Sequence, residues 1–442
     1  MNVRADTAGD YNWIVVAASL VAAVISLILY WQLQFPIASA VTVALVFLAV
    51  AVARPSAALA LLCAVLPVEG IAAANIEMTE VRAVGIGVFV IWVVHLVLYR
   101  KLIRVNRTFL LGAALVAWAG VSLLWATNFE ITGAYYFTLI QVLLLALLCI
   151  NVIENETDFR LVLGGLLLGA LITSHLSLAV FVENVVERAR TFEAQNPNSY
   201  AMVVGFSMLG GMYLMRSMRR WWIKVGLLLA TLFMAVPLIL AQSRTAWMAT
   251  VAGFAVMIWH TRHRVRNFLI LFVITAGLLA GLFAAGLVNI TLVERTSQLM
   301  TMREKGTSRF DVWMVASNMI ADNPVLGVGY MQFPSRFNQY RPATPSIRRD
   351  LHSRRDPHST YFSVIAELGI VGFALLMAML WSACREEKIH PGGKPWLSDS
   401  FVVYLMMFSV GGTLLHAKLF WVGLALAAKA RHLAAVREEN LE

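Results

Sequence analysis

The sequence predicts an all-α polytopic membrane protein, and three observations support this fold class. Of the 442 residues, 60% are apolar and only 14% are charged, whereas soluble domains contain roughly 25% charged residues. No charged side chain occurs between Trp13 and Val52. Short basic loops alternate with less basic loops between the apolar segments, as membrane topology requires. We therefore expect helices that cross a bilayer rather than a soluble core.

The apolar segments predict about 12 transmembrane helices in a single membrane domain, residues 1–442. A helix needs about 20 mostly apolar residues to cross the hydrocarbon core. The candidate spans are 13–31, 35–53, 57–68, 83–99, 108–125, 131–150, 161–182, 198–215, 225–241, 245–259, 267–288, 358–383 and 400–428. The last is long enough for two short helices that meet near His416. No basic leader or cleavage site precedes the first span, so we expect an uncleaved anchor. If the last segment is a pair of helices, the number of spans is even and both termini are expected on the cytoplasmic side.

The distribution of charge orients these spans. The loops at 99–107, 216–224 and 260–266 are basic and are therefore expected on the cytoplasmic side. The loops at 69–80, 126–130, 183–198 and 289–357 then face outward. The basic residues behind the net charge of +10 cluster in the short basic loops. The charge therefore does not indicate nucleic-acid binding. The three cysteines, Cys63, Cys149 and Cys384, lie in spans or on the inner side and form no disulfide framework.

The long outward loop, residues 289–357, is basic and contains a helix of its own. It holds ten Arg or Lys and six Asp or Glu, a net charge of +4, which indicates an anionic partner or simply a solvated charged loop. Ser308 and Asp311 resemble a capping box, and Asn323-Pro324 ends the helix. The apolar stripe of this helix comprises Phe310, Trp313, Met314 and Ser317, with Ile320 near it. We expect an amphipathic helix along the outer membrane–water boundary.

A histidine at the membrane lip is the first candidate site residue. Asp356 as N-cap and Pro357 as first helical residue predict a helix start, with His358 in the first turn. The helix dipole and the neighbouring Arg354 and Arg355 disfavour a positively charged imidazole there. A neutral imidazole can act as a general base, and the same helix terminus suits a phosphate group. An interfacial polar histidine is the alternative.

Three arginines are the next candidates. Arg244 lies in a very short outward turn between two apolar helices, and a charge at such a depth marks function by default, usually facing a cavity. Snorkelling to lipid headgroups is the alternative. Arg190 precedes an outward helix start that contains Asn198, and Arg309 opens the amphipathic helix. Each of these two could also be a surface charge.

Three further residues share the helix of His358. Glu367 falls on the opposite face and about 13 Å deeper, so it cannot orient the imidazole, and we interpret it as a buried packing contact whose partner the sequence does not give. Tyr361 and Phe362 share the face of His358. They line either a glycan or lipid cleft or the helix core.

Several chemistries find no support in the sequence. No Gly-rich phosphate loop follows a strand, and no Cys/His spacing suits a metal. No Asp-x-Asp pair lies in an outward loop, which disfavours a metal-dependent sugar-nucleotide transferase. We therefore expect neither metal nor cofactor. A donor activated by a lipid diphosphate needs no metal if arginines neutralise the leaving group.

Four segments resemble the O-antigen ligase and O-antigen polymerase superfamily. They are "RTFEAQNPNSYAM", "QSRTAWMA", "SRFDVWMVASNMIADNPVLGVGYMQF" and "DPHSTYFSVIAELGIVG", and the last two are specific in combination. They cover the chain from about Arg190 to Gly372, whereas the N-terminal half matches only as generic spans. By position, His358 matches the essential periplasmic histidine of the family. Ser359 departs from the pattern, since many relatives have asparagine after the histidine.

The resemblance implies a bacterial inner-membrane glycosyltransferase with its active site facing the periplasm. Such an enzyme moves a glycan from undecaprenyl diphosphate onto a sugar hydroxyl, without nucleotide or metal and with inversion. By position Arg190, Arg244 and Arg309 match the outward-facing arginines of the family, with Arg190 the loosest alignment. We expect Arg244 and Arg309 to bind the diphosphate and His358 to act as base. Substrate-binding residues are expected at Arg190, Asn198, Arg354, Arg355 and Tyr361.

The two enzyme interpretations that remain, ligase and polymerase, differ in their acceptor. We favour an O-antigen ligase of lipopolysaccharide biosynthesis, because its acceptor, lipid A-core, is densely phosphorylated and suits the basic outer loop. A polymerase that joins lipid-linked repeats is the alternative within the superfamily. A secondary transporter would require broken helices in both halves and charges deep in the bundle, while the candidate residues cluster at the outer boundary. A passive scaffold would explain neither Arg244 nor His358.

Overall fold

The protein is helical throughout the part of the chain that the computed structural model describes, which is residues 51–68, 80–183, 189, 196–284, 309–341, 356–385 and 396–439. Among these residues every regular element is a helix, which confirms the all-α class. Five of the described helices are long and apolar enough to cross a membrane, namely Arg107–Trp125, Thr132–Val152, Glu156–Val182, Trp221–Leu240 and Thr360–Arg385. The protein is therefore an integral membrane protein by the length and composition of its helices.

Shorter apolar helices accompany these five, at Pro55–Val65, Val84–Tyr99 and Trp396–Gly411. The expected span at 13–31, and all of the span at 35–53 except its last three residues, lie outside the described residues. The expected number of about 12 spans therefore stays a prediction.

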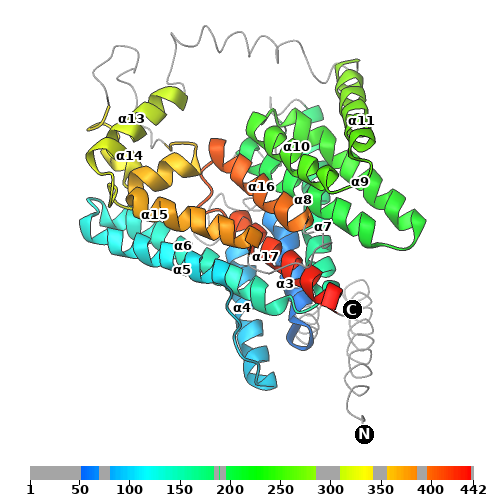
Figure 1. Ribbon diagram of the computed structural model, residues 1–442, viewed down its shortest axis with the longest axis horizontal. Helices are drawn as coiled ribbons and strands as arrows, with labels where there is room; N and C mark the ends of the chain where they lie inside the picture. The colour runs from blue at the N-terminus through cyan, green and yellow to red at the C-terminus, as the bar shows by residue number, and fades with distance from the viewer. Residues whose placement is uncertain are drawn as a thin grey trace, which may run out of the picture. The chain divides into compact units, whose positions relative to one another are not determined.

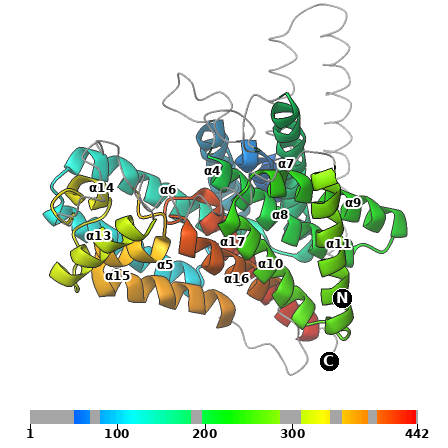
Figure 2. The same cartoon turned by 90° about the horizontal axis from the view of Figure 1, so that it is seen from above.

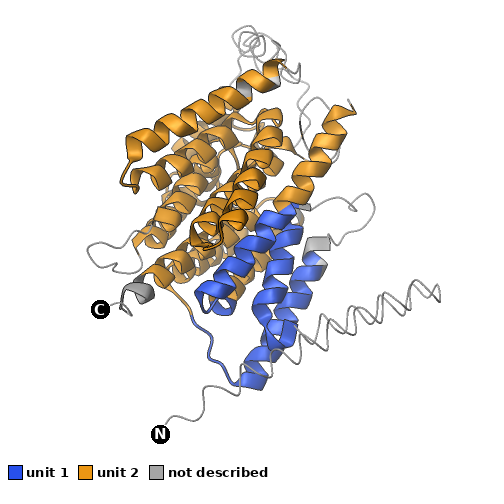
Figure 3. Ribbon diagram, turned by 90° about the vertical axis from the view of Figure 1, so that its right-hand side faces the viewer, with its two compact units in different colours: residues 1–104, 151–169 blue, residues 105–150, 170–442 orange. Residues whose placement is uncertain are grey.

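The chain divides into two compact units (Figure 3). Unit 1 comprises residues 1–104 and 151–169, and unit 2 comprises residues 105–150 and 170–442. Unit 1 holds α3 (Pro55–Val65), η1 (Leu66–Val68), α4 (Glu80–Tyr99) and the first part of α7 (Glu156–Val182). Unit 2 holds the rest of α7, α5 (Arg107–Val121), η2 (Ser122–Trp125), nearly all of α6 (Phe129–Val152), α8 (Pro197–Ser217), α9 (Trp221–Leu240), α10 (Arg244–Trp259), α11 (Arg264–Ala284), α13 (Arg309–Asp322), α14 (Phe333–Arg336), α15 (Thr360–Arg385), α16 (Trp396–Gly411) and α17 (Lys418–Glu439).

Close helix contact organises unit 1. A Cβ atom placed on Gly165 or Gly169 of α7 would lie 2.1 Å or 2.0 Å from the carbonyl oxygen of Ala60 or Ala64 in α3. Only glycine permits this approach, which is the usual role of small residues between membrane helices. The hydroxyl of Ser56 also donates a hydrogen bond of 2.7 Å to Asp158, so the starts of α3 and α7 are held together.

Unit 2 is a bundle in which α10 packs along α16, α8 along α9, and α15 along α5. Figures 1 and 2 both show α13 and α14 at the same end of α15, where α15 begins. The last apolar stretch forms two helices, because α16 ends at Gly411 and α17 begins at Lys418. The hinge expected near His416 is thus confirmed.

A kink in α15 divides this long helix into two parts. Gly369 has φ 65° and ψ −167°, a conformation that side-chain-bearing residues avoid. The kink releases backbone groups that a straight helix would pair internally, and each such buried group needs a new partner. The Ile370 N–H donates to the carbonyl of Pro324 at 2.9 Å, and the Trp118 indole N–H donates to the carbonyl of Leu368 at 2.9 Å.

The loop after α13 occupies the other groups that the kink releases. The N–H of Val328 donates to the carbonyl of Ala366 at 2.9 Å, and that of Gly329 donates to the carbonyl of Glu367 at 2.8 Å. These bonds join residues that lie nearly 40 positions apart in the sequence. The loop is thereby fixed in the kink, and α13, which precedes it, is fixed beside α15.

We predict that Gly369→Ala destabilises the protein strongly. The new Cβ would lie 2.0 Å from the carbonyl oxygen of Val325, and the positive φ adds strain of about 1–3 kcal/mol. The measurement is thermal unfolding of the purified protein in detergent. The matched control is Gly133→Ala in α6, where a Cβ would meet nothing within 4 Å. Equal unfolding midpoints for the two variants would contradict the role of the kink.

Candidate active site

The turn between α16 and α17 holds the beginning of α15. The carbonyl of Gly412 accepts hydrogen bonds from the backbone N–H of Thr360 at 2.9 Å and from its hydroxyl at 2.7 Å. The Thr360 hydroxyl oxygen in turn accepts from the N–H of Leu414 at 3.0 Å. Residues 411–414, which we call the Gly411 turn, therefore fix where α15 starts.

His358 lies just before this helix in a bent backbone conformation. Its φ is +50°, a region that is sparsely populated for residues other than glycine but in which histidine is enriched. Asp356 supports this bend, because its Oδ1 accepts from the His358 N–H at 3.0 Å and from the Thr413 hydroxyl. The His358 side chain is exposed, so the imidazole is presented to a ligand rather than packed in the core.

The expected helix start at Asp356 and Pro357 is therefore wrong. The helix begins at Thr360, because the left-handed conformation at His358 cannot continue a helix. Ser359 precedes the helix, and its carbonyl accepts the first helical bond from Ser363 at 2.9 Å. His358 is not in the first helical turn, so the expected effect of the helix dipole on its imidazole rested on a wrong placement.

Trp313 connects α13 to the segment that carries His358. Its indole N–H donates to the carbonyl of Pro357 at 2.9 Å, and its ring stacks on Phe362 with centroids 5.0 Å apart. Phe310 contacts Trp313 edge-on, with ring centroids 5.7 Å apart. The first turn of α13, where Arg309 lies, is thus held beside the histidine segment.

Arg309 reaches the same turn from α13. A Cβ on Gly411 would lie 2.8 Å from Nη1 of Arg309 and 2.3 Å from Oγ1 of Thr245. Glycine at position 411 therefore allows the guanidinium and the start of α10 to approach the end of α16. Arg244 is the first residue of α10, after a connection of only three residues from α9. The short turn expected around Arg244 is confirmed.

The two guanidinium groups affect each other. Burial and the nearby positive charge of Arg244 both lower the pKa of Arg309. No carboxylate among the described side chains forms an ion pair with either arginine. Two neighbouring cations without a described acidic partner form an electropositive point that an anion can stabilise.

The structure thus brings the segments that carry His358, Arg244 and Arg309 together around the Gly411 turn. Arg190, Arg354 and Arg355 lie outside the described residues, and their expected roles stay predictions. Asn198 lies in the first turn of α8, after the N-cap Asn196 and Pro197, and its N–H donates to the Asn196 side chain at 2.9 Å. Tyr361 donates its hydroxyl to the carbonyl of Met406 at 2.9 Å.

Glu367 has a partner that sequence reasoning could not name. Its side chain is buried in α15, as expected, and its carboxyl oxygens accept from the backbone N–H groups of Met331 at 3.0 Å and Phe333 at 3.2 Å. The partner is therefore the backbone of the loop that occupies the kink. The side chain of Glu367 therefore holds the same loop that the carbonyl groups of Ala366 and Glu367 hold through backbone hydrogen bonds.

Gln332, between those two residues, was missed by sequence reasoning. It is completely buried, accepts from the Thr127 hydroxyl at 2.7 Å and donates to the Thr132 hydroxyl at 2.5 Å. These bonds tie the loop to the start of α6. A single amide in the apolar stretch "GVGYMQF" was the only available signal.

The predicted helix in the long loop is confirmed as α13. Phe310 and Met314, which belong to the expected stripe, are 74% and 49% exposed and remain available to a membrane surface. The opposite side of α13 packs in a core, which the stripe did not reveal: it contains Val312, Val315, Ala316 and Met319 of α13 together with Val328, Phe333, Phe337 and Ala366. The helix is thus apolar on two sides.

A second imidazole lies close to Asp356. His416 follows the Gly411 turn and contacts Tyr135 edge-on, with ring centroids 5.8 Å apart. Burial lowers the pKa of His416, and the carboxylate of Asp356 opposes that effect. The neutral form is therefore favoured. The sequence singled this residue out only as part of a hinge.

The all-α membrane fold and a cationic turn in the segment next to an exposed histidine describe a membrane protein with a candidate ligand site at helix ends. Residues 229–377 match the family described as O-antigen ligase, and this range contains Arg244, Arg309 and His358. Over this part of the chain, the match confirms the resemblance to the O-antigen ligase and O-antigen polymerase superfamily that the sequence motifs indicated. No curated protein matches the chain.

We predict that His416 makes stability depend on pH. Because its pKa is lowered in the folded state, the unfolded chain takes up a proton below about pH 6.5 and the folded protein does not. Stability is therefore complete above that pH and declines below it. Unfolding midpoints measured across this range should fall less for His416→Gln than for the control His263→Gln, whose ring is exposed. Parallel profiles would contradict the prediction.

Proposed function

We propose that the protein is an O-antigen ligase, a glycosyltransferase that moves O-antigen from undecaprenyl diphosphate to lipid A-core. The observation that carries this proposal is the Gly411 turn, which gathers beside an exposed histidine two guanidinium groups that no described carboxylate neutralises. The family match over residues 229–377 supports the class of chemistry. The arrangement supplies the two groups that such a transfer needs, an anion site for the leaving group and a base for the acceptor.

The donor diphosphate binds at Arg244 and Arg309. An anion between the two relieves the repulsion that lowers the Arg309 pKa, so it contributes binding energy at the point where the two charges oppose each other. Arginine–phosphate contacts are strong and directional. As the bond between the first sugar carbon and the diphosphate oxygen breaks, negative charge grows on that oxygen. The guanidinium groups stabilise this charge, which is usually the largest catalytic contribution.

His358 acts as the base. Its imidazole removes the proton from an acceptor hydroxyl while the hydroxyl oxygen forms the new bond to the first sugar carbon of the donor. The diphosphate leaves with the electron pair of the broken bond, and one displacement inverts the carbon centre. The Asp356 carboxylate and the positive φ fix the backbone at His358, so the ring is positioned before substrate arrives. Neither nucleotide nor metal enters this step.

The proposed topology places this site in the periplasm of a bacterium whose inner membrane holds the protein. Both termini face the cytoplasm, about 12 helices span the membrane, and the loops at 183–198 and 289–357 face outward. This orientation rests on the basic loops at 99–107, 216–224 and 260–266, which mark the cytoplasmic side. Arg190, Asn198, Arg354, Arg355 and Tyr361 contribute to substrate binding in the same proposal.

An O-antigen polymerase is the second candidate, because the matched superfamily includes both activities. The two differ in the acceptor, which is lipid A-core for a ligase and a lipid-linked repeat for a polymerase. The basic composition of residues 289–357, with a net charge of +4, favours the phosphorylated lipid A-core. Supplying each acceptor separately to the purified protein distinguishes the two.

A transporter is less well supported. The break in α15 at Gly369 is the kind of feature that transporters use to coordinate ions through free carbonyl groups. Here the carbonyls of Ala366, Glu367 and Leu368 accept bonds from protein N–H groups. They are therefore not available to a transported ion.

We predict that His358→Ala abolishes transfer while donor binding persists. Loss of a general base costs about two to four orders of magnitude in rate. The assay combines purified protein in lipid vesicles, undecaprenyl-diphosphate-linked O-antigen and lipid A-core, with chelator and without nucleotide. His263→Ala serves as the control. Wild-type turnover by His358→Ala would remove the base from the proposal, and the absence of any transfer by the wild type would remove the function.

A second prediction separates function from stability at Arg309. Because burial and Arg244 oppose its charge, Arg309→Gln should leave the unfolding midpoint unchanged or raise it. The same change should reduce kcat/KM for the lipid-linked donor by about 10²-fold or more. Arg262→Gln, at an exposed arginine on another loop, should affect neither quantity. Parallel losses of stability and activity would instead indicate a structural role for Arg309.

A further inference from the structure

Unit 1 contains a polar cavity that the proposed transfer does not use. Its volume is about 1170 Å³, and its walls come from the start of α3, the end of α4, the following segment 100–104, the end of α6 and the start of α7. All lining residues belong to unit 1. A cavity of this size can hold a ligand of the size of a lipid headgroup with the upper part of its chains.

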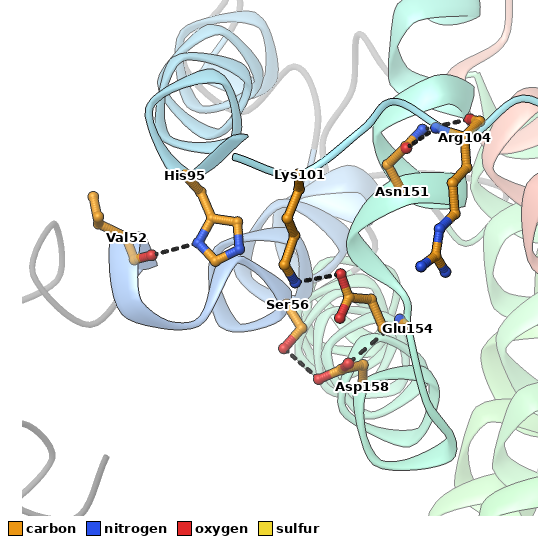
Figure 4. A network of polar contacts seen from close by, with 8 residues as sticks. All are labelled: Val52, Ser56, His95, Lys101, Arg104, Asn151, Glu154 and Asp158. Atoms are coloured by element: carbon orange, nitrogen blue, oxygen red, sulfur yellow. Dashed lines mark hydrogen bonds and ion pairs between the residues drawn. The ribbon is translucent and has the colours of Figure 1, made fainter. Parts of the chain in front are cut away.

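The cavity wall is built by a chain of hydrogen bonds (Figure 4). The His95 ring donates from Nδ1 to the carbonyl of Val52 at 2.9 Å, because a carbonyl can only accept. Lys101 forms an ion pair with Glu154 at 2.5 Å. The His95 bond joins α4 to the segment just before α3, and the Lys101 ion pair joins the segment after α4 to the segment just before α7, so the cavity is an ordered part of the unit.

Arg104 is held at this cavity by its backbone rather than by its side chain. Its N–H donates to the Asn151 side chain at 2.7 Å, and its carbonyl accepts from the same side chain at 2.9 Å. Figure 4 shows the guanidinium extending away from these bonds. No described carboxylate forms an ion pair with it. A cation positioned in this way at a cavity is suited to bind an anion.

The cavity carries more positive than negative side chains. Arg54, Lys101 and Arg104 line it together with Glu154 and Asp158. Lys101 is paired with Glu154, and Asp158 accepts from Ser56 at 2.7 Å while Arg54 lies 3.9 Å away. The positive charge left over is that of Arg104, while Arg54 lines the same cavity and keeps a long ion pair with Asp158.

The entrance of the cavity is apolar and exposed. Leu102 and Ile103, between the basic residues, are 87% and 55% exposed, which is unusual for such side chains unless a membrane or partner covers them. Only Arg100 and Lys101 separate them from the end of α4, an apolar helix. A basic and apolar segment at the end of a membrane helix lies at the level of the lipid headgroups.

We propose that this cavity binds an anionic phospholipid. The phosphate group contacts Arg104 and Arg54, and the upper acyl chain packs on Leu102 and Ile103. The basic residues mark this end of the helices as cytoplasmic, where anionic lipids attract polybasic segments. This proposal is independent of the glycan transfer at the Gly411 turn, since none of its residues takes part there.

The test measures lipid retention by the purified full-length protein with native mass spectrometry. Phosphatidylglycerol and phosphatidylcholine with the same acyl chains are supplied in equal amounts. Wild-type protein should retain phosphatidylglycerol preferentially. Arg104→Gln should reduce this retention by about fivefold, and Arg54→Gln combined with Arg104→Gln should reduce it further. Arg266→Gln, at an exposed arginine in the first turn of α11, is the matched control and should behave as wild type.

Two further experiments complete the test. One distinguishes a bound lipid from free phosphate, and the other distinguishes loss of lipid binding from loss of the fold. Inorganic phosphate should stabilise the protein against thermal unfolding less than phosphatidylglycerol does; equal stabilisation would identify a free phosphate site and overturn the lipid proposal. Leu102→Asn changes an exposed side chain, so the fold should persist while phosphatidylglycerol retention falls. Retention that is equal in wild type, Leu102→Asn and Arg104→Gln would also overturn the proposal.

Discussion

The hydrogen bonds made by the kink in α15 are the constraint on which the candidate site depends. Gly369 interrupts the helix, and the N–H groups of Val328 and Gly329 replace the lost helical partners. Glu367 adds bonds to the next residues of the same loop. Because α13 continues directly into this loop, the position of Arg309 follows from the kink. The histidine segment is fixed separately, through Thr360 and the carbonyl of Gly412.

Two separate sets of contacts position the candidate site, one at the kink inside the bundle and one at the helix ends around the Gly411 turn. Inside unit 2, glycine and a buried carboxyl group set the position of α13. At its surface, the Gly411 turn receives the histidine segment, the start of α10 and the Arg309 side chain. Backbone groups make most of these bonds. Among the described side chains, no carboxylate forms an ion pair with His358 or Arg309, so both remain candidates for contact with a ligand.

The fold class and most helix positions could be predicted from the sequence, because apolar length and caps such as Asn196-Pro197 are local signals. The grouping of Arg244, Arg309 and His358 could be inferred only through family resemblance, since more than 100 residues separate the first from the last. Local rules failed at His358: Asp-Pro usually starts a helix, yet the bond from Asp356 to Thr413 favours a turn. The partners of Glu367 and Gln332 are backbone and hydroxyl groups of distant segments, which no pattern of side chains reveals.

The glycine at position 411 limits how related chains can build the same site. Any side chain at that position would collide with Thr245 and with the Arg309 guanidinium, so the small size of the glycine is what admits the cation to the turn. A bulkier residue there would require the Thr245 side chain and the flexible guanidinium of Arg309 to shift. One small residue, far from either arginine in the sequence, thus sets how closely the Arg309 guanidinium can approach the end of α16.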